Sequence, residues 1–316
     1  MSPRHQALAW ERRWAIPVAI AALLTVVGFV VSGALSSNIS GEGQAALLRS
    51  AHEHSSSVTL SGAIDALAFV LLALPLGYLF RVVEARGEGV RNGMIALVVA
   101  APLFLAISTG LGVAAKHDAA NAFTAGEAKS TLSDKEASKE CAATLKDKGA
   151  KSFADEYPPQ GSETPRAACE RREIEDDEAS NAVSDASLSG LATFFGIAGG
   201  LSLILGLFYT SLWAMRTGVL SRFWAALGMA LGVTVLLGVV LFLLFWLVYL
   251  GLLIGGWVPG GRPPAWAAGK AIPWPSPGEK TAATLESQGE AEPPSEPNDP
   301  RELEDPEDPT ATGRSQ

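Results

Sequence analysis

Long blocks of uncharged, apolar residues decide what kind of protein this chain can form. No Asp, Glu, Lys or Arg occurs within residues 14–32, 66–80 or 93–115. Each block is long enough, or nearly so, to cross about 30 Å of hydrocarbon at roughly 1.5 Å per helical residue. Two further blocks cover residues 187–215 and 223–261. We therefore expect an all-α, polytopic bundle of membrane helices rather than a soluble domain.

The last block is too long for a single crossing. One helix over residues 220–257 would measure about 57 Å, roughly twice the hydrocarbon thickness. Two helices of about 18 residues that reverse near Gly238 and Val239 would fit, although this stretch lacks polar turn residues. The sequence thus predicts six membrane helices, with five as the alternative. The six cover about 14–35, 60–80, 92–115, 187–215, 220–238 and 240–257.

Lys and Arg in the short connections predict the orientation of the chain. They occur in the N-terminal tail, residues 1–13, and after the second, fourth and sixth predicted helices, whereas the connection after the first helix contains only Arg49. Because cytoplasmic loops are enriched in Lys and Arg, six helices put both termini in the cytoplasm of a plasma-membrane protein, and five would put the C-terminal tail outside. The first apolar block is longer than that of a usual signal peptide, so we expect it to be retained as an anchor.

Acidic residues concentrate in two polar segments. Residues 116–186 hold 16 Asp and Glu against 10 Lys and Arg, and residues 277–316 hold 11 against 3. The net charge of −9 therefore belongs to solvent-exposed segments, and it indicates neither an acidic binding face nor a nucleic-acid partner. We expect residues 116–186 to form an extracytoplasmic loop and residues 279–316 to form a disordered, acidic cytoplasmic tail.

Both cysteines of the chain, Cys141 and Cys169, lie in the predicted extracytoplasmic loop. A cysteine pair in an oxidising compartment indicates a disulfide, which would stabilise the fold by about 3.5 kcal/mol in the chain-entropy model; two free thiols are the alternative. The flanking sequence is rich in Ala, Glu and Lys and poor in large apolar residues, so we expect two helical stretches without a core of their own. We expect this loop to be a small cap or a surface that contacts a partner.

Few residues of the predicted helices could carry chemistry. Asp65 is the one ionisable candidate, if the second helix is counted from Ser61, either as an ion or proton site or as a carboxylate at the membrane interface. His52, His54 and His117 lack the spacing of a zinc site, and we expect them to be solvated. No catalytic motif occurs, so the sequence predicts a non-enzymatic protein without metal or cofactor.

Glycines spaced four residues apart occur in each of the last three predicted helices. Such pairs leave a smooth stripe on which helices approach closely. We therefore expect these three helices to pack together. The pairs are Gly196 and Gly200, Gly228 and Gly232, and Gly251 and Gly255.

The stretch "WVPGGRPPAWAAGKAIPWPSPGE" follows the last apolar block. Trp257, Trp266 and Trp274 could place their amphipathic rings at headgroup depth, and the prolines predict an extended backbone without helix. Residues 258–278 are therefore predicted to form an interfacial collar, with a plain disordered linker as the alternative.

Two stretches carry a resemblance to other proteins. They are "YTSLWAMRTGVLSRFWAALGMALGV", residues 209–233, and "VPGGRPPAWAAGKAIPWPSPGE", which begins at Val258. They resemble a family of uncharacterised, six-helix membrane proteins of actinobacteria, in which an AMR-x-G-x-x-x-RF turn is paired with a PGGRPPAW exit. Where that family has an acid soon after PPAW, this chain has Ala267 and Ala268. The resemblance implies six helices with an inside tail and supplies no mechanism.

Taken together, these features predict a structural or interaction protein of the plasma membrane. Its partners would be the lipid bilayer and proteins that contact the external loop or the acidic tail. A small-solute or ion transporter, or a channel subunit, is the alternative, although the apolar blocks hold only scattered hydroxyl residues and no internal repeat. These residues are Ser108, Thr109, Thr210, Ser211 and Thr234.

Overall fold

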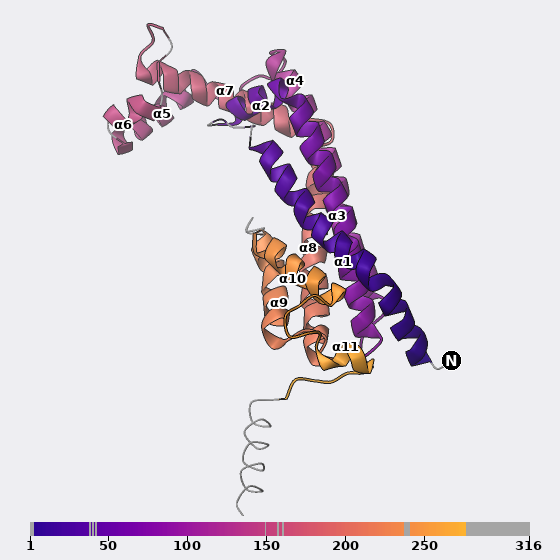
Figure 1. Ribbon diagram of the computed structural model, residues 1–316. Helices are drawn as coiled ribbons and strands as arrows, with labels where there is room; N and C mark the ends of the chain where they lie inside the picture. Colours follow the sequence, from indigo (N-terminus) through magenta and orange to yellow (C-terminus); the bar gives the residue numbers. More distant parts are fainter. Residues whose placement is uncertain are drawn as a thin grey trace, which may run out of the picture. The chain divides into compact units, whose positions relative to one another are not determined.

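The structure is a computed structural model that describes residues 3–37, 39, 41, 43–148, 150–156, 158–159, 161–236 and 241–275. All regular elements in these ranges are α-helices, which confirms the all-α class (Figure 1). The predicted reversal at Gly238 and Val239 and the predicted tail, residues 279–316, lie outside the described residues. The chain divides into two units, Met1–Pro273 and Trp274–Gln316, and every helix of the described residues belongs to the first.

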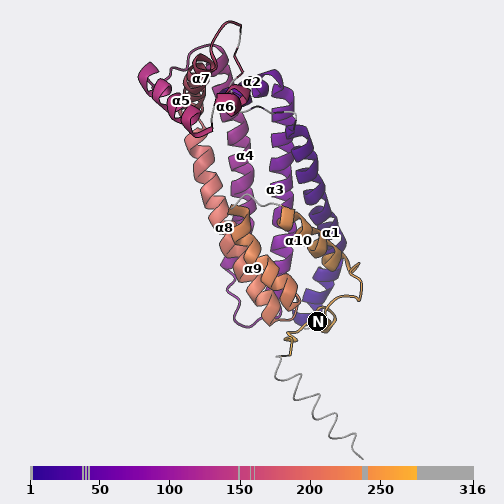
Figure 2. The same cartoon turned by 90° about the vertical axis from the view of Figure 1, so that its left-hand side faces the viewer.

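Four long helices lie side by side in the first unit. They are α1 (Pro3–Ser36), α3 (Ser55–Glu84), α4 (Met94–Thr124) and α8 (Ser189–Arg216). All four are long and apolar enough to cross a membrane, with α1 counted from Ala9. Each packs against the next in this order (Figure 1, Figure 2). We call the end of this row that carries the N-terminus the base end, and the opposite end the cap end.

Two shorter helices, α9 (Arg222–Leu236) and α10 (Leu241–Gly255), lie beside the base half of the row (Figure 2). α9 starts shortly after α8 ends, and α10 returns to a turn at Gly256, whose φ is +80°. Each has 15 residues and is therefore about 22 Å long, short of the roughly 30 Å of hydrocarbon. The prediction of six spanning helices is therefore not confirmed, since four helices of the described residues are long and apolar enough to span.

The pair of α9 and α10 packs on one face of the row. Leu72, Leu76 and Leu79 of α3 and Trp246 of α10 are all at most 3% exposed in the shared core. Since lipid tails are as apolar as leucine, close packing rather than the exclusion of water stabilises such a contact within a membrane. The two short helices therefore complete the core of the base half.

The predicted packing glycines serve three different contacts. Gly228 and Gly232 of α9 approach α8, in line with the expectation. Gly196 of α8 instead approaches α4, and Gly251 of α10 approaches α1. The last three apolar helices therefore use their glycines against the row as well as against one another. The remaining two are Gly200, which is buried, and Gly255, which lies against Trp257.

Four helices gather at the cap end, and we call them the cap (Figure 1). They are α2 (Gln44–Glu53), α5 (Asp134–Lys148), α6 (Ala150–Glu156) and α7 (Pro165–Asp185). The predicted disulfide is present: Cys141 of α5 is bonded to Cys169 of α7, with 6.0 Å between the Cα atoms.

The cap corrects two expectations. The connection predicted from residue 116 begins as helix, because α4 continues to Thr124. The segment also has small cores, although none was expected from its composition. Phe153 is 1% exposed beside the disulfide, and alanines of α2, α4 and α7 form a second cluster. Alanine builds such a cluster because its small side chain lets helix backbones approach closely.

A buried ion pair joins distant segments at the base end. Arg86, in the turn after α3, donates to both carboxylate oxygens of Glu11 on α1 at 2.7 and 2.8 Å. The same guanidinium donates to the backbone oxygens of Ala265 and Trp266 at 2.9 and 3.3 Å. The side chains of Arg86 and Glu11 are 0% and 8% exposed. We call Glu11, Arg86, Ala265 and Trp266 the base lock.

The segment after α10 contains a helix that its prolines do not predict. Residues Pro264–Ala268 form α11. Pro263 stands at the N-cap and Pro264 opens the first turn, where a helix needs no backbone N–H and tolerates proline. The predicted extended collar is therefore corrected to a segment with one short helix.

Trp266 also differs from its predicted role at headgroup depth. It is 5% exposed, and its indole N–H donates to the backbone oxygen of Val219 at 2.9 Å. An indole can satisfy its apolar ring and its N–H within the protein as well as at a membrane surface. Trp257 is 50% exposed, and its headgroup contact, like that of Trp274, stays a prediction.

Removing the cation of the base lock should destabilise the protein strongly. Arg86→Leu leaves the Glu11 carboxylate buried without its donor, and breaking a buried pair in this way costs about 3–5 kcal/mol. We expect a large fall in the thermal unfolding midpoint in detergent, and a partial recovery in the double variant with Glu11→Leu. The control is Arg81→Leu, because Arg81 pairs with Glu84 at the surface, where a pair contributes about 0–1 kcal/mol. Equal, small shifts for Arg86→Leu and Arg81→Leu would contradict the role of the lock.

Candidate functional site

A cavity lies at the cap end, between the row of long helices and the cap. Its volume is about 550 Å³, within the range of small-ligand sites. Its walls come from α1, α2, α3 and α4, with one side chain from α7. We call it the cap cavity. Its polar and charged lining residues are Ser36, Gln44, Ser61, Asp65, Thr109 and Lys116.

Asp65, the predicted intramembrane carboxylate, stands in the wall of this cavity. Ser32 of α1, which is 3% exposed, lies near its carboxylate. Lys116 of α4 is near enough to act on Asp65 electrostatically, yet no ion pair between the two occurs in the described part of the chain. Asp65 is partly buried and Lys116 is exposed. The cavity therefore presents a carboxylate and an ammonium group that are not paired with each other.

The cavity lies on a face of α3 whose residues nearer the base are buried in the core that Trp246 of α10 shares. Val58, Ser61 and Asp65 line the cap cavity, and Leu72 and Leu76 are buried in the core with α10. These residues recur at intervals of three, four or seven, so they share one helix face.

α4 repeats this arrangement. Lys116, Gly112 and Thr109 line the cap cavity, and Leu105 and Val98 follow on the same face toward the base. Val98 belongs to the buried core, and Leu105 is partly buried against it. One continuous surface is thus polar at the cap end and apolar toward the base.

Charged contacts hold α2 in the wall of the cavity. Asp176 of α7 accepts a hydrogen bond from the backbone N–H of Ala45 in the first turn of α2, at 2.8 Å. The helix dipole favours a carboxylate at this position. Arg49 of α2 pairs with Glu175 of α7, also at 2.8 Å. α7 therefore positions the helix that contributes Gln44 to the cavity.

His117 and one cluster of candidate metal ligands lie at the cap end of the described chain. His117 Nε2 lies 2.8 Å from the hydroxyl of Thr59. One set of candidate ligands, Cys141, Cys169 and Glu173, lies within a common 4.8 Å. Its two sulfur atoms form the disulfide, and a disulfide sulfur is not the thiolate that binds a metal.

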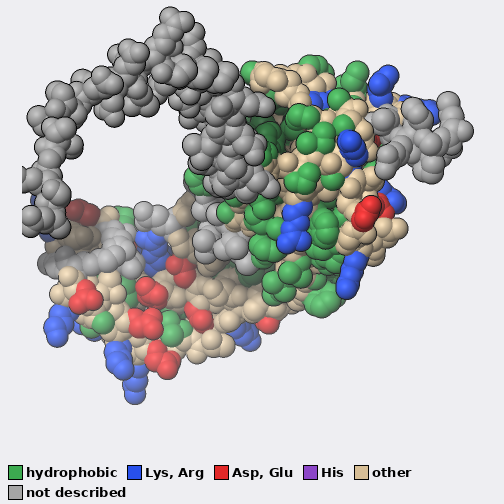
Figure 3. Space-filling view, turned by 90° about the horizontal axis from the view of Figure 1, so that it is seen from below, with side chains coloured by type: hydrophobic (Ala, Val, Ile, Leu, Met, Phe, Trp, Pro, Cys, Tyr) green, Lys and Arg blue, Asp and Glu red, His purple; other side chains and the backbone are tan. Residues whose placement is uncertain are grey.

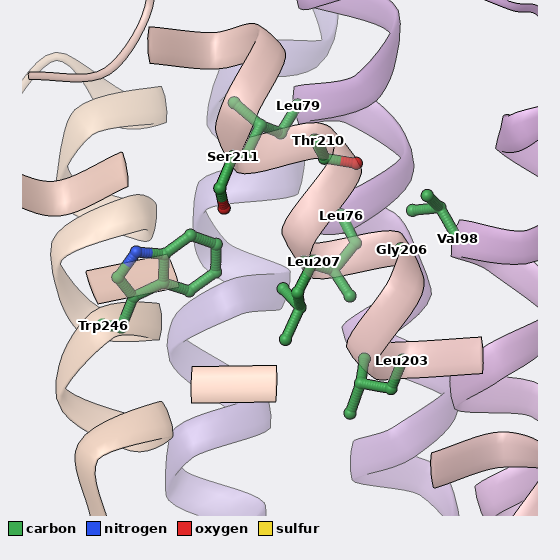
Figure 4. Close-up of a pocket in the computed structure, with 9 residues that line it drawn as sticks. All are labelled: Leu76, Leu79, Val98, Leu203, Gly206, Leu207, Thr210, Ser211 and Trp246. Carbon is green, nitrogen blue, oxygen red and sulfur yellow. The ribbon is translucent and has the colours of Figure 1, made fainter. Parts of the chain in front are cut away.

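A second, small cavity in the core is lined by side chains of α3, α4, α8 and α10 (Figure 4). Thr210 and Ser211 of α8 line it, and their buried hydroxyls have no hydrogen-bond partner among the described residues. Thr25, by contrast, donates to the carbonyl oxygen of Ala21 in its own helix. Figure 4 shows the Ser211 hydroxyl pointing toward the indole of Trp246. The cavity has no space for a water molecule, so each unbonded hydroxyl costs about 1–3 kcal/mol.

No family model, curated protein or solved structure matches the chain. The two stretches that resemble the actinobacterial family nevertheless meet in space. The N–H of Ile272 donates to the carbonyl oxygen of Thr217 at 3.1 Å, and Trp266 reaches Val219 in the same turn. Membership of that family stays a prediction, and the contact gives a structural reason for the two stretches to occur together.

Asp177 of α7 fastens the segment that precedes α5. Its carboxylate accepts hydrogen bonds from the hydroxyl of Ser130 at 2.8 Å and from the backbone N–H groups of Thr131 and Leu132 at 2.7 and 3.1 Å. These bonds, that from Ser130 foremost, lower the pKa of Asp177. The charged carboxylate therefore stabilises the cap.

Acid should loosen this attachment. Because the folded-state pKa of Asp177 lies below the unfolded value of about 3.9, its contribution is complete above that pH and is lost as the pH falls through the folded-state value. Amide exchange at residues 131 and 132 should be faster in Asp177→Asn than in the native protein at neutral pH. The ratio of the two rates should approach one at strongly acidic pH. Asp185→Asn, on an exposed carboxylate of the same helix, is the control, and a ratio independent of pH would refute the assignment.

Proposed function

We propose that this chain is an integral plasma-membrane protein that acts by binding at its cap end, with the cap outside the cell and both termini in the cytoplasm. The observation that carries the proposal is the cap cavity. It offers Asp65 and Lys116 to a ligand at one end of a helix face, and Leu72, Leu76 and Leu79 fill that face toward the other end. Charged groups in the cavity and a filled apolar core beneath it suit a site that holds a ligand at the cap end of the bundle.

Transport or channel activity is the second candidate and has less support. A solute that moved from the cap cavity along α3 toward the base would have to displace Leu72 and Leu76, which are 0% and 3% exposed. It would then meet the base lock, where Arg86 is already bonded to Glu11 and to backbone oxygens. Passage along this path would require the core of the base half to separate.

Two observations support the proposed orientation. Figure 3, viewed from the base end, has Lys and Arg side chains among hydrophobic ones, and short cytoplasmic connections are enriched in these cations. The disulfide belongs in an oxidising compartment, which favours an external cap. The number of crossings does not alter the result, because α9 begins and α10 ends at the base end. The cations near the base are Arg12, Arg13, Arg81, Arg91, Arg216, Arg222, Arg262 and Lys270.

Cysteine labelling tests the orientation. Both native cysteines are in the disulfide, so a single added cysteine is the free thiol of the chain. We expect a membrane-impermeant maleimide to label Ala143→Cys, on an exposed position of α5, in intact cells. It should label Glu88→Cys, in the exposed turn between α3 and α4, only after the cells are opened. Labelling with the reverse pattern would invert the proposed sidedness.

A flux assay separates binding from transport. If Asp65 serves a binding site, Asp65→Asn in proteoliposomes should leave proton and ion flux equal to that of the native protein, at the level of empty liposomes. A transporter that uses this carboxylate should carry a coupled flux that the variant loses. Such a flux in the native protein, abolished by Asp65→Asn, would replace the binding proposal with transport.

A further inference from the structure

We infer that the cap cavity binds the headgroup of a phospholipid that carries a primary amine, a phosphatidylethanolamine of the outer leaflet. The inference rests on the proposed function, since it names what the cap end binds.

The charges of the cavity match a zwitterion. Asp65 and Lys116 belong to neighbouring helices and no ion pair joins them in the described residues, so both are open to a ligand. A carboxylate has about four acceptor positions. The ammonium of phosphatidylethanolamine can donate to these, and its phosphate can accept from Lys116. A headgroup with a single charge would bind to one of the two side chains and leave the other without a partner in the ligand.

Both charged residues adjoin an uncharged block. Asp65 precedes residues 66–80 and follows ten uncharged residues of α3, and Lys116 immediately follows residues 93–115. The 23 residues of the second block measure about 34 Å as a helix, which places Lys116 at the boundary of the hydrocarbon in a bilayer, and Asp65 lines the same cavity. The cavity is thus at the level that a headgroup already occupies.

An apolar surface continues from the cavity toward the middle of the bundle. Phe69 of α3 and Leu105 of α4 lie on the two faces described above, and both are only partly buried. Phe29 of α1 meets Phe69 edge to face, with 4.9 Å between ring centroids. An acyl chain can lie along this partly exposed apolar surface, which favours a lipid over a free zwitterion.

The first test fills the cavity without touching a charge. Gly112 lines the cavity, and a Cβ placed on it would meet no atom within 4 Å. Gly112→Leu should therefore fold and occupy the space of the headgroup. Gly110→Leu is the matched control, since Gly110 is equally open and is not among the lining residues. Both changes also raise helix propensity by a similar amount.

The readout is lipid retention by the full-length protein. The protein is released from nanodiscs that contain equal amounts of phosphatidylethanolamine, phosphatidylglycerol and phosphatidylcholine, and the bound lipids are counted by native mass spectrometry. We expect the native protein and Gly110→Leu to keep one phosphatidylethanolamine in preference to the other lipids. Gly112→Leu should reduce this retention by about tenfold or more, which corresponds to the loss of one good contact.

The second test separates the two charges. Asp65→Asn should remove the preference for phosphatidylethanolamine over phosphatidylcholine, because an amide does not pair with an ammonium ion. Lys116→Gln should lower the retention of both lipids, because both contain the phosphate. Asp185→Asn and Lys129→Gln, on exposed positions of the cap end, should behave as the native protein does. Thermal unfolding of each variant in detergent reports whether it has folded.

Three outcomes would overturn the inference. The first is equal retention of the three lipids by the native protein, and the second is undiminished retention by folded Gly112→Leu. The third is displacement of the lipid by soluble glycerophosphoethanolamine at an equal concentration, which would assign the cavity to a free zwitterion. Nanodiscs expose both faces of the bilayer, so a reversed orientation in cells would not change these results. Failure of the proposed sidedness and failure of the lipid assignment are therefore distinguishable.

Discussion

The guanidinium of Arg86 determines how the base half of this protein is assembled. It binds the carboxylate of Glu11 through two nitrogens and the backbone oxygens of Val82, Ala265 and Trp266. A buried cation is very costly unless its donors are used, so the surrounding segments must converge on it. The segments are α1, the turn after α3, and α11. Their relative positions along the row follow from this one side chain.

The lock also fixes how far α10 extends. Arg262 donates to the carbonyl oxygens of Leu253 and Ile254 in the last turn of α10, which would otherwise lack donors. The guanidinium groups of Arg86 and Arg262 both lie over the ring of Trp266, at 5.7 and 5.1 Å from its centroid. The end of α10 is thus held at the base, where the helix packs against α1 and α9.

Some of this architecture follows directly from local sequence signals. Uninterrupted apolar blocks predict α1, α3, α4 and α8 because a backbone in lipid must satisfy its own hydrogen bonds. The pairing of Cys141 with Cys169 was predictable because the chain offers no other cysteine. Asp65 was recognised as a candidate because a charge next to an apolar block is costly without a reason. Each of these inferences needed only residues close together in the sequence, or the number of cysteines in the chain.

The rest depends on contacts between distant residues. Glu11 and Arg86 are separated by 75 positions, and Arg86 and Ala265 by 179, so the sequence presents Arg86 only as one more cation of a short connection. Trp266 fits a membrane surface and a buried cation site equally well by its chemistry. The cap cavity takes its lining from five helices, and no single stretch of sequence carries a pattern for it. The positions of α9 and α10 along the row likewise depend on contacts at their ends with distant parts of the chain.

The two ends of the molecule differ in the kind of electrostatics that holds them. At the base, Arg86 and Glu11 are 0% and 8% exposed, whereas Arg49 and Glu175, which join α2 to α7, are 51% and 23% exposed. Exposed pairs contribute about 0–1 kcal/mol each and are screened by salt, so the ion pair alone does not hold α2. Ala45 and Leu48 of α2, which are 3% and 4% exposed, pack in the apolar cluster shared with α4 and α7. The wall of the cap cavity is therefore held mainly by apolar packing, whereas one buried ion pair joins the segments of the base.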